Sequence, residues 1–408
     1  MKNTRIATTL LAASIALIGC GEEQKPAAEA TSGAAPQAQV LEIRIGHVAP
    51  LTGGIAHLGK DNENGARLAI DEANAAKITI DGKQAQFVLL GEDDQADPKV
   101  GTTVAQKLVD AKVNAVVGHL NSGTTIPASS VYNQAGIPMI SGSATNPQLT
   151  EQGFKGIFRV VGRDDQQGPA VASYLSAEKK PKVVAVIDDA TAYGEGIANE
   201  VEKTLKAANI RVLPREKGTD KTTDWKAILT KLRGQRPDAI FYGGMDATGG
   251  PLLKQGRELG LKAVFAFGDG ACTDKMKELA GDAAEGLLCS QAGIPPQAAS
   301  KNFLDAYKAK FNVDPILYAP FTYDSTNLFI EAMKKANSAD PAKYLPELQK
   351  ISFTGATGAI SFDEKGDRKD AEITIFTMKG GKIEPLAVVK SGKTVPYEEF
   401  LKSMGGGK

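Results

Sequence analysis

The sequence predicts an α/β fold with two doubly wound parallel sheets, and three observations support this prediction. Short apolar, β-branched runs recur along the chain without polar alternation, as is typical of strands buried in a parallel sheet. Segments of helical length separate these runs. The alternation occurs in two successive series, one up to residue 161 and one from residue 167. Because strands alternating with helices form βαβ units, each series is expected to build one lobe.

Length and composition are those of a globular protein. The 408 residues leave room for two or three domains, and the contents of 42% hydrophobic and 24% charged residues are average. Basic and acidic residues number 48 each, which favours neither nucleic acid nor an anionic membrane surface as a partner. Apolar runs stay short of the roughly 18–20 residues of a membrane span.

The N-terminus predicts export. Residues 1–19 have basic residues before a short apolar core, as in a secretory signal peptide. The segment ends in Leu-Ile-Gly before Cys20, which resembles the lipobox of bacterial lipoproteins, where the cysteine is lipidated. A plain signal peptide that happens to precede a cysteine is the alternative. Residues 20–40 are rich in Ala, Pro and Glu and cannot bury a core, so we expect a disordered tether after the lipidated Cys20.

In the first series, strands and helices alternate from the first strand onward. Pro98 stands at the favoured first position of one of the predicted helices. Strands are predicted over Leu41–Val48, Gln86–Leu90, Val113–Val117, Ile137–Ile140 and Gly156–Val161, and helices over Asp61–Ala76 and Pro98–Ala111. A further helical segment separates the third and fourth strands, and an acidic loop, residues 91–94, follows the second.

The second series repeats the pattern. Helices are predicted over Gln167–Ala177, Gly194–Ala208, Asp224–Arg233 and Ala247–Leu259, and strands over Lys182–Ile187, Arg211–Leu213, Ala239–Tyr242 and Ala263–Phe267. A third block differs, with helices over Gln297–Phe311, Phe321–Ala336 and Pro341–Lys350 and strands over Ala359–Phe362, Glu372–Met378 and Ile383–Val389. Its place after two matched lobes suggests that the chain recrosses between them, so that the lobes hinge.

Two Ser/Thr loops follow neighbouring strands of the first series. The first contains Asn121, Ser122, Thr124 and Thr125, and the second contains Ser141, Ser143 and Thr145. Each stands beside an expected helix N-terminus, whose free N–H groups and partial positive charge suit a carboxylate or a phosphate. Ordinary N-caps are the alternative for either loop. Two such loops at the carboxyl ends of strands favour a ligand site.

The sequence lacks the motifs of common enzyme and metal sites. We find no Walker A, G-x-S-x-G, H-E-x-x-H or C-x-x-C motif, and the three histidines lack metal-ligand spacing. His119 follows a strand end, where we expect a hydrogen-bonded structural role. Without a nucleophile and base, we expect neither enzymatic activity nor a cofactor.

Asp269 lies between two glycines after an apolar strand. An acid in this place is either a turn former or a counter-charge for a cationic group. Together with the Ser/Thr loops it supplies an acid for an ammonium and donors for a carboxylate. A buried zwitterionic amino acid requires this pairing.

Cys272 and Cys289 are the other two cysteines. In an oxidising compartment they are expected to form a disulfide, and two separate buried thiols are the alternative.

From about Glu42 to Phe376 the sequence resembles the leucine/isoleucine/valine-binding family of periplasmic substrate-binding proteins of ABC transporters. The resembling segments keep their order: DDQADPK, VVGHLNSGTTIPAS, MISGSATNPQLT, DQQGPA, YGEG, FYGG, GDG, AEGLL and FDEKGD. The resemblance implies the type I periplasmic binding protein fold, with two Rossmann-like lobes, a three-crossover hinge and Venus-flytrap closure on the ligand. The implied lobes are residues 41–162 plus 293–373 and residues 163–292 plus 374–408.

The resemblance also implies roles for single residues. Ser122 and Thr145 match positions that hold the ligand carboxylate, and Ser143, through its carbonyl, and Asp269 match the ammonium ligands. Tyr193 matches a tyrosine that closes on the ligand.

Three departures from the family pattern affect the expected pocket. Leu58 and Met245 stand where branched-chain binders have tyrosines, which places strict branched-chain selectivity in question. Asp269 stands where those binders have Glu. Ala96 and Asn121 replace a cysteine pair that forms a disulfide in some relatives.

The resulting expectation is a periplasmic or extracytoplasmic solute-binding protein of an ABC importer. It would bind a neutral aliphatic L-amino acid of the branched-chain type, leucine, isoleucine, valine or similar, in the cleft between the lobes. We expect a monomer that delivers its ligand to a permease of the inner membrane and contacts the membrane only through lipidated Cys20. A sensory protein that presents its closed form to a receptor is the alternative.

Overall fold

The structure is a computed structural model of the chain and describes residues 40–403. The predicted signal peptide, the lipidation site Cys20 and the tether up to residue 39 lie outside the described residues. Within residues 40–403, no helix has both the length and the apolar character needed to cross a membrane. The same residues contain no cluster of His, Cys, Asp and Glu side chains suited to a metal ion.

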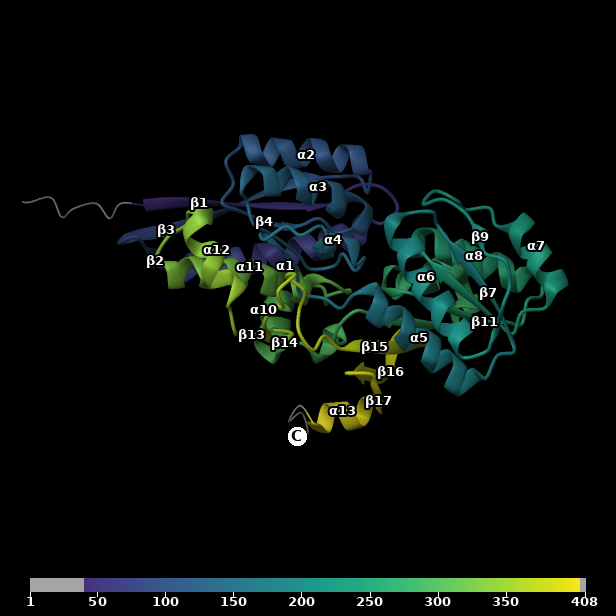
Figure 1. The fold of residues 1–408 in the computed structure, drawn as a ribbon. Coiled ribbons are helices and arrows are strands. Elements are labelled where there is room, and N and C mark those ends of the chain that lie inside the picture. The colour runs from purple at the N-terminus through teal and green to yellow at the C-terminus, as the bar shows by residue number, and fades with distance from the viewer. Residues whose placement is uncertain (1–39, 404–408) are drawn as a thin grey trace, which may run out of the picture. The chain divides into compact units, whose positions relative to one another are not determined.

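The first sheet has six strands in the order β2-β3-β1-β4-β5-β6, and all neighbours are parallel except β2 and β3. Helix α11 packs on α1, and α2 lies beside α3 (Figure 1). The strands are β1 (Val40–Ala49), β2 (Thr79–Ile80), β3 (Lys83–Asp93), β4 (Ala115–Gly118), β5 (Met139–Ser141) and β6 (Ile157–Arg159). The helices are α1 (Ala56–Ala75), α2 (Pro98–Asp110), α3 (Ser122–Ala135), α4 (Gln148–Glu151), α10 (Lys301–Phe311), α11 (Ala319–Ala336) and α12 (Pro341–Gln349).

The second sheet has nine strands in the order β17-β16-β15-β12-β11-β10-β7-β8, with β9 beside β7. The strands from β12 to β8 are parallel, whereas β15, β16 and β17 are antiparallel. The strands are β7 (Val183–Asp188), β8 (Arg211–Val212), β9 (Glu216–Lys217), β10 (Ala239–Gly243), β11 (Val264–Phe267), β12 (Leu288–Gln291), β15 (Ile373–Lys379), β16 (Lys382–Lys390) and β17 (Lys393–Pro396). The helices are α5 (Asp164–Lys179), α6 (Ala192–Ala207), α7 (Lys226–Gln235), α8 (Asp246–Glu258), α9 (Lys275–Ala280) and α13 (Tyr397–Ser403).

The chain passes between the two sheets three times. It crosses between β6 and α5, returns between β12 and α10, and crosses again between a short hairpin, β13 (Phe353–Gly355) and β14 (Gly358–Ile360), and β15. The third block of the sequence is therefore divided, because its helices belong with the first sheet and β15–β17 with the second. This architecture confirms the predicted fold class.

Burial explains why the central strands have uninterrupted apolar sequences. Every residue of β4 and every residue of β10 is buried. A strand covered by helices on both faces needs apolar side chains at successive positions, and each buried aliphatic or aromatic side chain contributes roughly 1.5–3 kcal/mol.

Several elements differ from the sequence-based expectation, among them α1, β3 and β12. Helix α1 begins at Ala56 and not at Asp61, and its first turns contain Gly59, which lowers the helical signal. A Cβ on Gly59 would lie only 2.0 Å from the carbonyl oxygen of Pro50, so the glycine allows the helix to approach that turn. Strand β3 extends to Asp93 because its pairing with β1 continues that far, so most of the predicted acidic loop is strand. Strand β12 was not predicted.

Candidate functional site

The two Ser/Thr loops lie together because β4 and β5, which precede them, are parallel neighbours. Ser122 begins α3, and its Oγ accepts a hydrogen bond of 3.2 Å from the N–H of Asn146 in the second loop. Ser143 Oγ donates to the carbonyl oxygen of Leu120 in the first loop at 3.0 Å. Both hydroxyls therefore hold one loop against the other.

Thr145 is 1% exposed, and within the described part of the chain its Oγ1 has no hydrogen-bond partner. Its carbonyl oxygen accepts a hydrogen bond of 2.9 Å from the N–H of Asp164. An unpaired buried hydroxyl costs roughly 1–3 kcal/mol, so a bound group that pairs with Thr145 would recover that energy.

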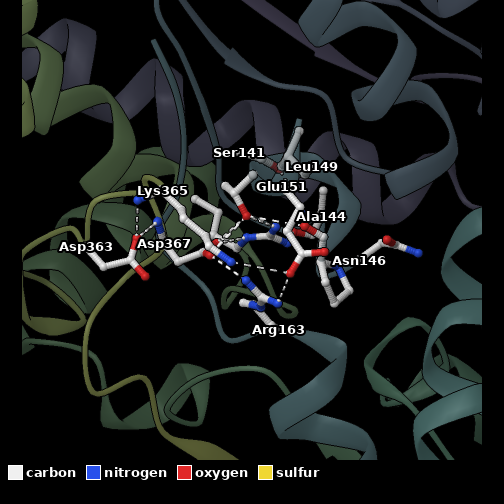
Figure 2. A network of polar contacts seen from close by, with 12 residues as sticks. Ser141, Ala144, Asn146, Leu149, Glu151, Arg163, Asp363, Lys365 and Asp367 are labelled. Atoms are coloured by element: carbon white, nitrogen blue, oxygen red, sulfur yellow. Dashed lines mark hydrogen bonds and ion pairs between the residues drawn. The ribbon is translucent and has the colours of Figure 1, made fainter. Parts of the chain in front are cut away.

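A buried arginine, Arg159, hydrogen-bonds to the backbone of the second loop. Arg159 Nη1 donates to the carbonyl oxygen of Ala144 at 2.8 Å, and its Nε donates to Asp367 Oδ1 at 2.6 Å. Asp367 also accepts from Arg163 Nη1 at 2.8 Å and from the Thr150 hydroxyl (Figure 2). Burial acts to raise the pKa of Asp367, but the two guanidiniums and the hydroxyl outweigh it and hold the pKa below its usual range. The loop and the third crossing segment are thus joined by one charged network.

Asp269 follows β11 and is 1% exposed. The Tyr193 hydroxyl donates to Oδ1 at 2.6 Å, and the Tyr318 hydroxyl donates to Oδ2 at 3.0 Å. Burial raises the pKa of Asp269, while the two hydroxyls act in the opposite direction. The structure therefore places two of the predicted site residues, Tyr193 and Asp269, in direct contact. Tyr318, which precedes α11, was missed because it follows an irregular segment without a recognisable pattern.

Two polar residues of α5 complete the surroundings of Asp269 and were also missed. Gln167, with its amide oriented to satisfy both neighbours, donates to Asp269 Oδ1 at 3.3 Å and accepts from the N–H of Ala292 at 3.1 Å. Asp164 is fully buried, and burial raises its pKa well above the ordinary value. In the sequence both residues belong to a polar run that is typical of an exposed helix start.

The glycines on either side of Asp269 are explained by close approaches. A Cβ on Gly268 would lie 2.3 Å from the Tyr193 hydroxyl oxygen, and a Cβ on Gly270 would lie 2.5 Å from the Met245 sulfur. Only a residue without a side chain lets the tyrosine and the methionine reach this turn.

Leu58 and Met245, the two predicted pocket residues, lie in one apolar cluster. Leu58 is fully buried and packs with Leu120, Leu317 and Tyr318, and the partly buried Met245 contacts the same cluster. Tyr318 therefore supplies an aromatic side chain where the sequence indicated that two tyrosines were missing.

A cleft of about 630 Å³ lies between loops of the two sheets. Its lining includes Gly53, Asn121 and Gly123 from the first sheet and Asp189, Tyr193 and Met245 from the second. Asn146 Nδ2 bridges the two sides, since it donates to the carbonyl oxygen of Ala192 at 2.6 Å. Ser143, Thr145 and Asp269 are buried and are not among the residues that line this cleft.

His119 has the structural surroundings that we expected. It is fully buried, with Nδ1 3.0 Å from Asp94 Oδ2 and Nε2 3.0 Å from the Tyr132 hydroxyl. Its carbonyl oxygen accepts from Ser141 Oγ at 2.9 Å, so it helps to connect the two Ser/Thr loops.

A disulfide joins Cys272, in the turn after Asp269, to Cys289 in β12. It therefore ties the turn that carries Asp269 to the neighbouring strand of the second sheet.

Comparison with known proteins gives consistent relatives. The sequence profile of the family described as periplasmic binding protein matches residues 42–382. The leucine-, isoleucine-, valine-, threonine-, and alanine-binding protein of Pseudomonas aeruginosa is 36% identical over 354 residues, which are 86% of this chain and 94% of that protein.

Two solved structures share the fold. A leucine-binding protein of Thermotoga maritima superposes with a TM-score of 0.78 at 29% identity, covering 86% of this chain and 99% of the other. A branched-chain amino acid transporter substrate-binding protein of Streptococcus pneumoniae, in complex with isoleucine, gives a TM-score of 0.78 at 32% identity, covering 86% of this chain and 100% of the other.

The profile match spans most of the chain, and the matched relatives are covered over nearly their whole length. The family is described as periplasmic, which implies a location outside the cytoplasm. This chain belongs to the leucine/isoleucine/valine-binding family of periplasmic binding proteins, which bind solutes and are not enzymes.

Proposed function

We propose that this protein is the extracytoplasmic solute-binding protein of an ABC importer and binds a neutral aliphatic L-amino acid of the branched-chain type. The observation that carries this proposal is Asp269, a buried carboxylate held by two tyrosine hydroxyls. A buried acid in the binding site of a solute-binding protein favours a cationic group on the ligand and disfavours a purely anionic solute. The names of the relatives, which bind leucine, isoleucine or valine, support the same class.

In this proposal the ligand carboxylate binds at the start of α3 and at the second loop, through Ser122 and Thr145. The ammonium binds the carbonyl of Ser143 and the carboxylate of Asp269, and Tyr193 closes over it. The unpaired Thr145 hydroxyl supports its place in the site, because a ligand oxygen would give it a partner. Leu58 and Met245 would contact the aliphatic side chain.

We also propose the two lobes as residues 41–162 plus 293–373 and residues 163–292 plus 374–408, closing on the ligand as a monomer. The three crossings of the chain support a hinge between them.

We further propose that residues 1–19 are removed as a signal peptide and that Cys20 is lipidated, so that the binding protein stays near the permease. Mass spectrometry of the mature N-terminus tests this proposal, and we expect it to begin at a lipidated Cys20. A Cys20→Ser variant should be released from the membrane. A mature protein whose Cys20 carries no lipid would contradict it.

The test of the ligand is a thermal-shift screen of the purified protein with the common amino acids, short amides and small carboxylates. A ligand present at 100 times its dissociation constant adds about 2.7 kcal/mol to the free energy of unfolding, which raises Tm by several degrees. We expect leucine, isoleucine or valine to raise Tm. A shift produced only by amides or small acids would refute the amino-acid proposal. A shift by alanine or threonine instead would show that Leu58 and Met245 have changed the side-chain pocket.

A further inference from the structure

Asp164 begins α5, directly after the first crossing between the sheets. Its side chain is fully buried, and within residues 40–403 neither carboxylate oxygen accepts a hydrogen bond of good length and angle, although the Thr145 hydroxyl lies near enough to favour the ionised form. Buried carboxylates in proteins are normally paired, because the loss of hydration is otherwise uncompensated. The group therefore needs either a proton or a cation.

The contacts around Asp164 place it beside the proposed ammonium site. Its N–H donates to the carbonyl oxygen of Thr145 at 2.9 Å, and the Thr145 hydroxyl is itself without a partner among the described residues. One helical turn later, Gln167 donates to Asp269 Oδ1 at 3.3 Å. Residues three apart share one face of a helix, so the first turn of α5 presents its face to both Thr145 and Asp269.

Helix α6 also lies close to the Asp164 carboxylate. A Cβ on Gly196 would lie 2.8 Å from Asp164 Oδ2 and 2.6 Å from Asn146 Nδ2. The same helix carries Tyr193, whose hydroxyl binds Asp269. Asp164 thus lies where the second Ser/Thr loop, α5 and α6 meet, within the part of the molecule that would surround an ammonium group.

The surroundings of Asp164 favour its neutral form, chiefly through burial. Burial is the largest cause and raises its pKa. The Thr145 hydroxyl opposes the rise, the Asp269 carboxylate adds to it, the Arg159 guanidinium opposes it and Asp165 adds to it. The net result is a pKa well above the ordinary value.

Asp269 differs, because it accepts hydrogen bonds from two tyrosine hydroxyls that favour its ionised form. The hydroxyls of Tyr193 and Tyr318 have pKa values raised well above the ordinary value, largely by burial, and remain neutral. The pKa of both acids is raised, and of the two Asp164 is the one whose protonated form is favoured more strongly.

We propose that Asp164 is a second acidic ligand of the amino acid's ammonium group and exchanges its proton for that group when the ligand enters. This inference rests on the proposed amino-acid-binding function. The carboxyl O–H bond breaks, the proton leaves to solvent, and the carboxylate accepts a hydrogen bond from the ammonium, which keeps its three hydrogens. No covalent bond of the ligand changes.

The exchange makes binding depend on pH. Below the pKa values of both the free and the occupied states, Asp164 is protonated throughout and no proton is released. Between these two values, affinity rises with pH by up to about tenfold per pH unit, because ligand binding then competes with a proton. Above both values, the dependence disappears.

Isothermal titration calorimetry of the protein with leucine, in two buffers of different ionisation enthalpy and over a pH series from 5 to 8, tests the proposal. We expect the wild type to release up to about one proton per leucine and its affinity to rise with pH. In an Asp164→Asn variant the release and the pH dependence disappear. The neighbouring Asp165→Asn variant is the control, because Asp165 is exposed and pairs with Arg163. It should still release a proton on binding leucine, with its pH range shifted slightly downward because the charge of Asp165 helps to raise the pKa of Asp164.

A wild-type protein that binds leucine without proton release at any of these pH values would overturn the inference and leave the proposed function intact. Release that persists in Asp164→Asn would also overturn it and would assign the proton to Asp269. The wild-type series is decisive on its own if the variant fails to fold. If the protein binds none of the amino acids in the thermal-shift screen, the proposed function itself is wrong. That outcome differs from leucine binding without proton release.

Discussion

At the scale of single residues, Asp269 is the central residue of the proposed ligand recognition. Its two oxygens are each held by one tyrosine, from α6 and from the segment before α11. A carboxylate fixed in this way is preorganised for a cation, because little rearrangement is needed when an ammonium arrives. The two tyrosines come from opposite sides of the cleft, so the acid also joins those sides.

Replacing Asp269 by Asn should weaken leucine binding by about 2–5 kcal/mol, roughly 30- to several-thousand-fold, because the ammonium loses its buried counter-charge. The amide oxygen and nitrogen can still pair with the two tyrosine hydroxyls, so Tm of the empty protein should change little. Calorimetry and thermal unfolding measure both effects.

The matched control is Asp324→Asn, since Asp324 is equally buried and is hydrogen-bonded to Thr357 and Ala356 far from the Ser/Thr loops in sequence. This variant should lose stability and keep its leucine affinity. Wild-type affinity in Asp269→Asn would remove Asp269 from the site.

The network around Arg159 acts at the scale of elements. The network connects β6, the turn of α4, the start of α5 and the third crossing segment (Figure 2). The Arg159 guanidinium donates to the carbonyl oxygen of Ala144, which lies between Ser143 and Thr145, two proposed ligand-binding residues. Because Arg159 is completely buried, its charge depends on Asp367 for compensation. The loop geometry therefore depends on an ion pair that is distant in sequence.

An Asp367→Asn variant should be destabilised by about 3–5 kcal/mol, because one buried charge then lacks its partner. The folded-state pKa of Asp367 is lowered, so its stabilising contribution is present above the unfolded-state pKa and is lost as the pH falls through the folded-state value. In urea unfolding, the difference between wild type and variant should therefore be full at pH 7 and shrink at strongly acidic pH.

Glu151→Gln serves as the comparison, since Glu151 pairs with Arg163 but is largely exposed. Its effect should stay below about 1 kcal/mol. An Asp367→Asn variant as mild as Glu151→Gln would show that the buried pair does not stabilise the fold.

The two sheets meet through a small number of polar contacts at the scale of the whole molecule. His57 Nε2 in α1 lies 2.7 Å from Asp246 Oδ2 at the start of α8, and the buried Asp246 also accepts from the Thr273 hydroxyl at 2.7 Å. Together with the contact from Asn146 to Ala192, this pair joins elements of opposite sheets. Such contacts favour the arrangement in which both sides of the cleft touch a ligand at once.

A His57→Leu variant should bind leucine about fivefold more weakly, a loss of about 1 kcal/mol, because the contact across the cleft is gone. The change should lie mainly in the dissociation rate, since closing contacts slow ligand escape. Stopped-flow displacement measures that rate. Lys60→Gln is the control, because Lys60 pairs with Glu63 inside α1, and an unchanged dissociation rate in His57→Leu would contradict a closing role.

Patterns that are local in sequence were sufficient to predict much of the fold and part of the site. The uninterrupted apolar strands β4 and β10, Pro98 at the start of α2 and the Ser/Thr loops are visible because their causes, burial and chain geometry, act within a few residues. Tyr193 was included in the site only through the resemblance to a family, and its hydrogen bond to Asp269 was not predicted.

The sequence by itself determined most of the alternation of strands and helices, and therefore the parallel parts of the two sheets, because hydrophobic periodicity reports burial one element at a time. Only the tertiary structure placed Tyr318 on Asp269, Arg159 behind Ala144 and Asp164 without a partner. Tyr318 and Asp269 are 49 positions apart, and the ion pair that holds Arg159 joins it to Asp367, 208 positions away. These relations depend on the three crossings that bring distant segments to one place, and no local pattern carries that information.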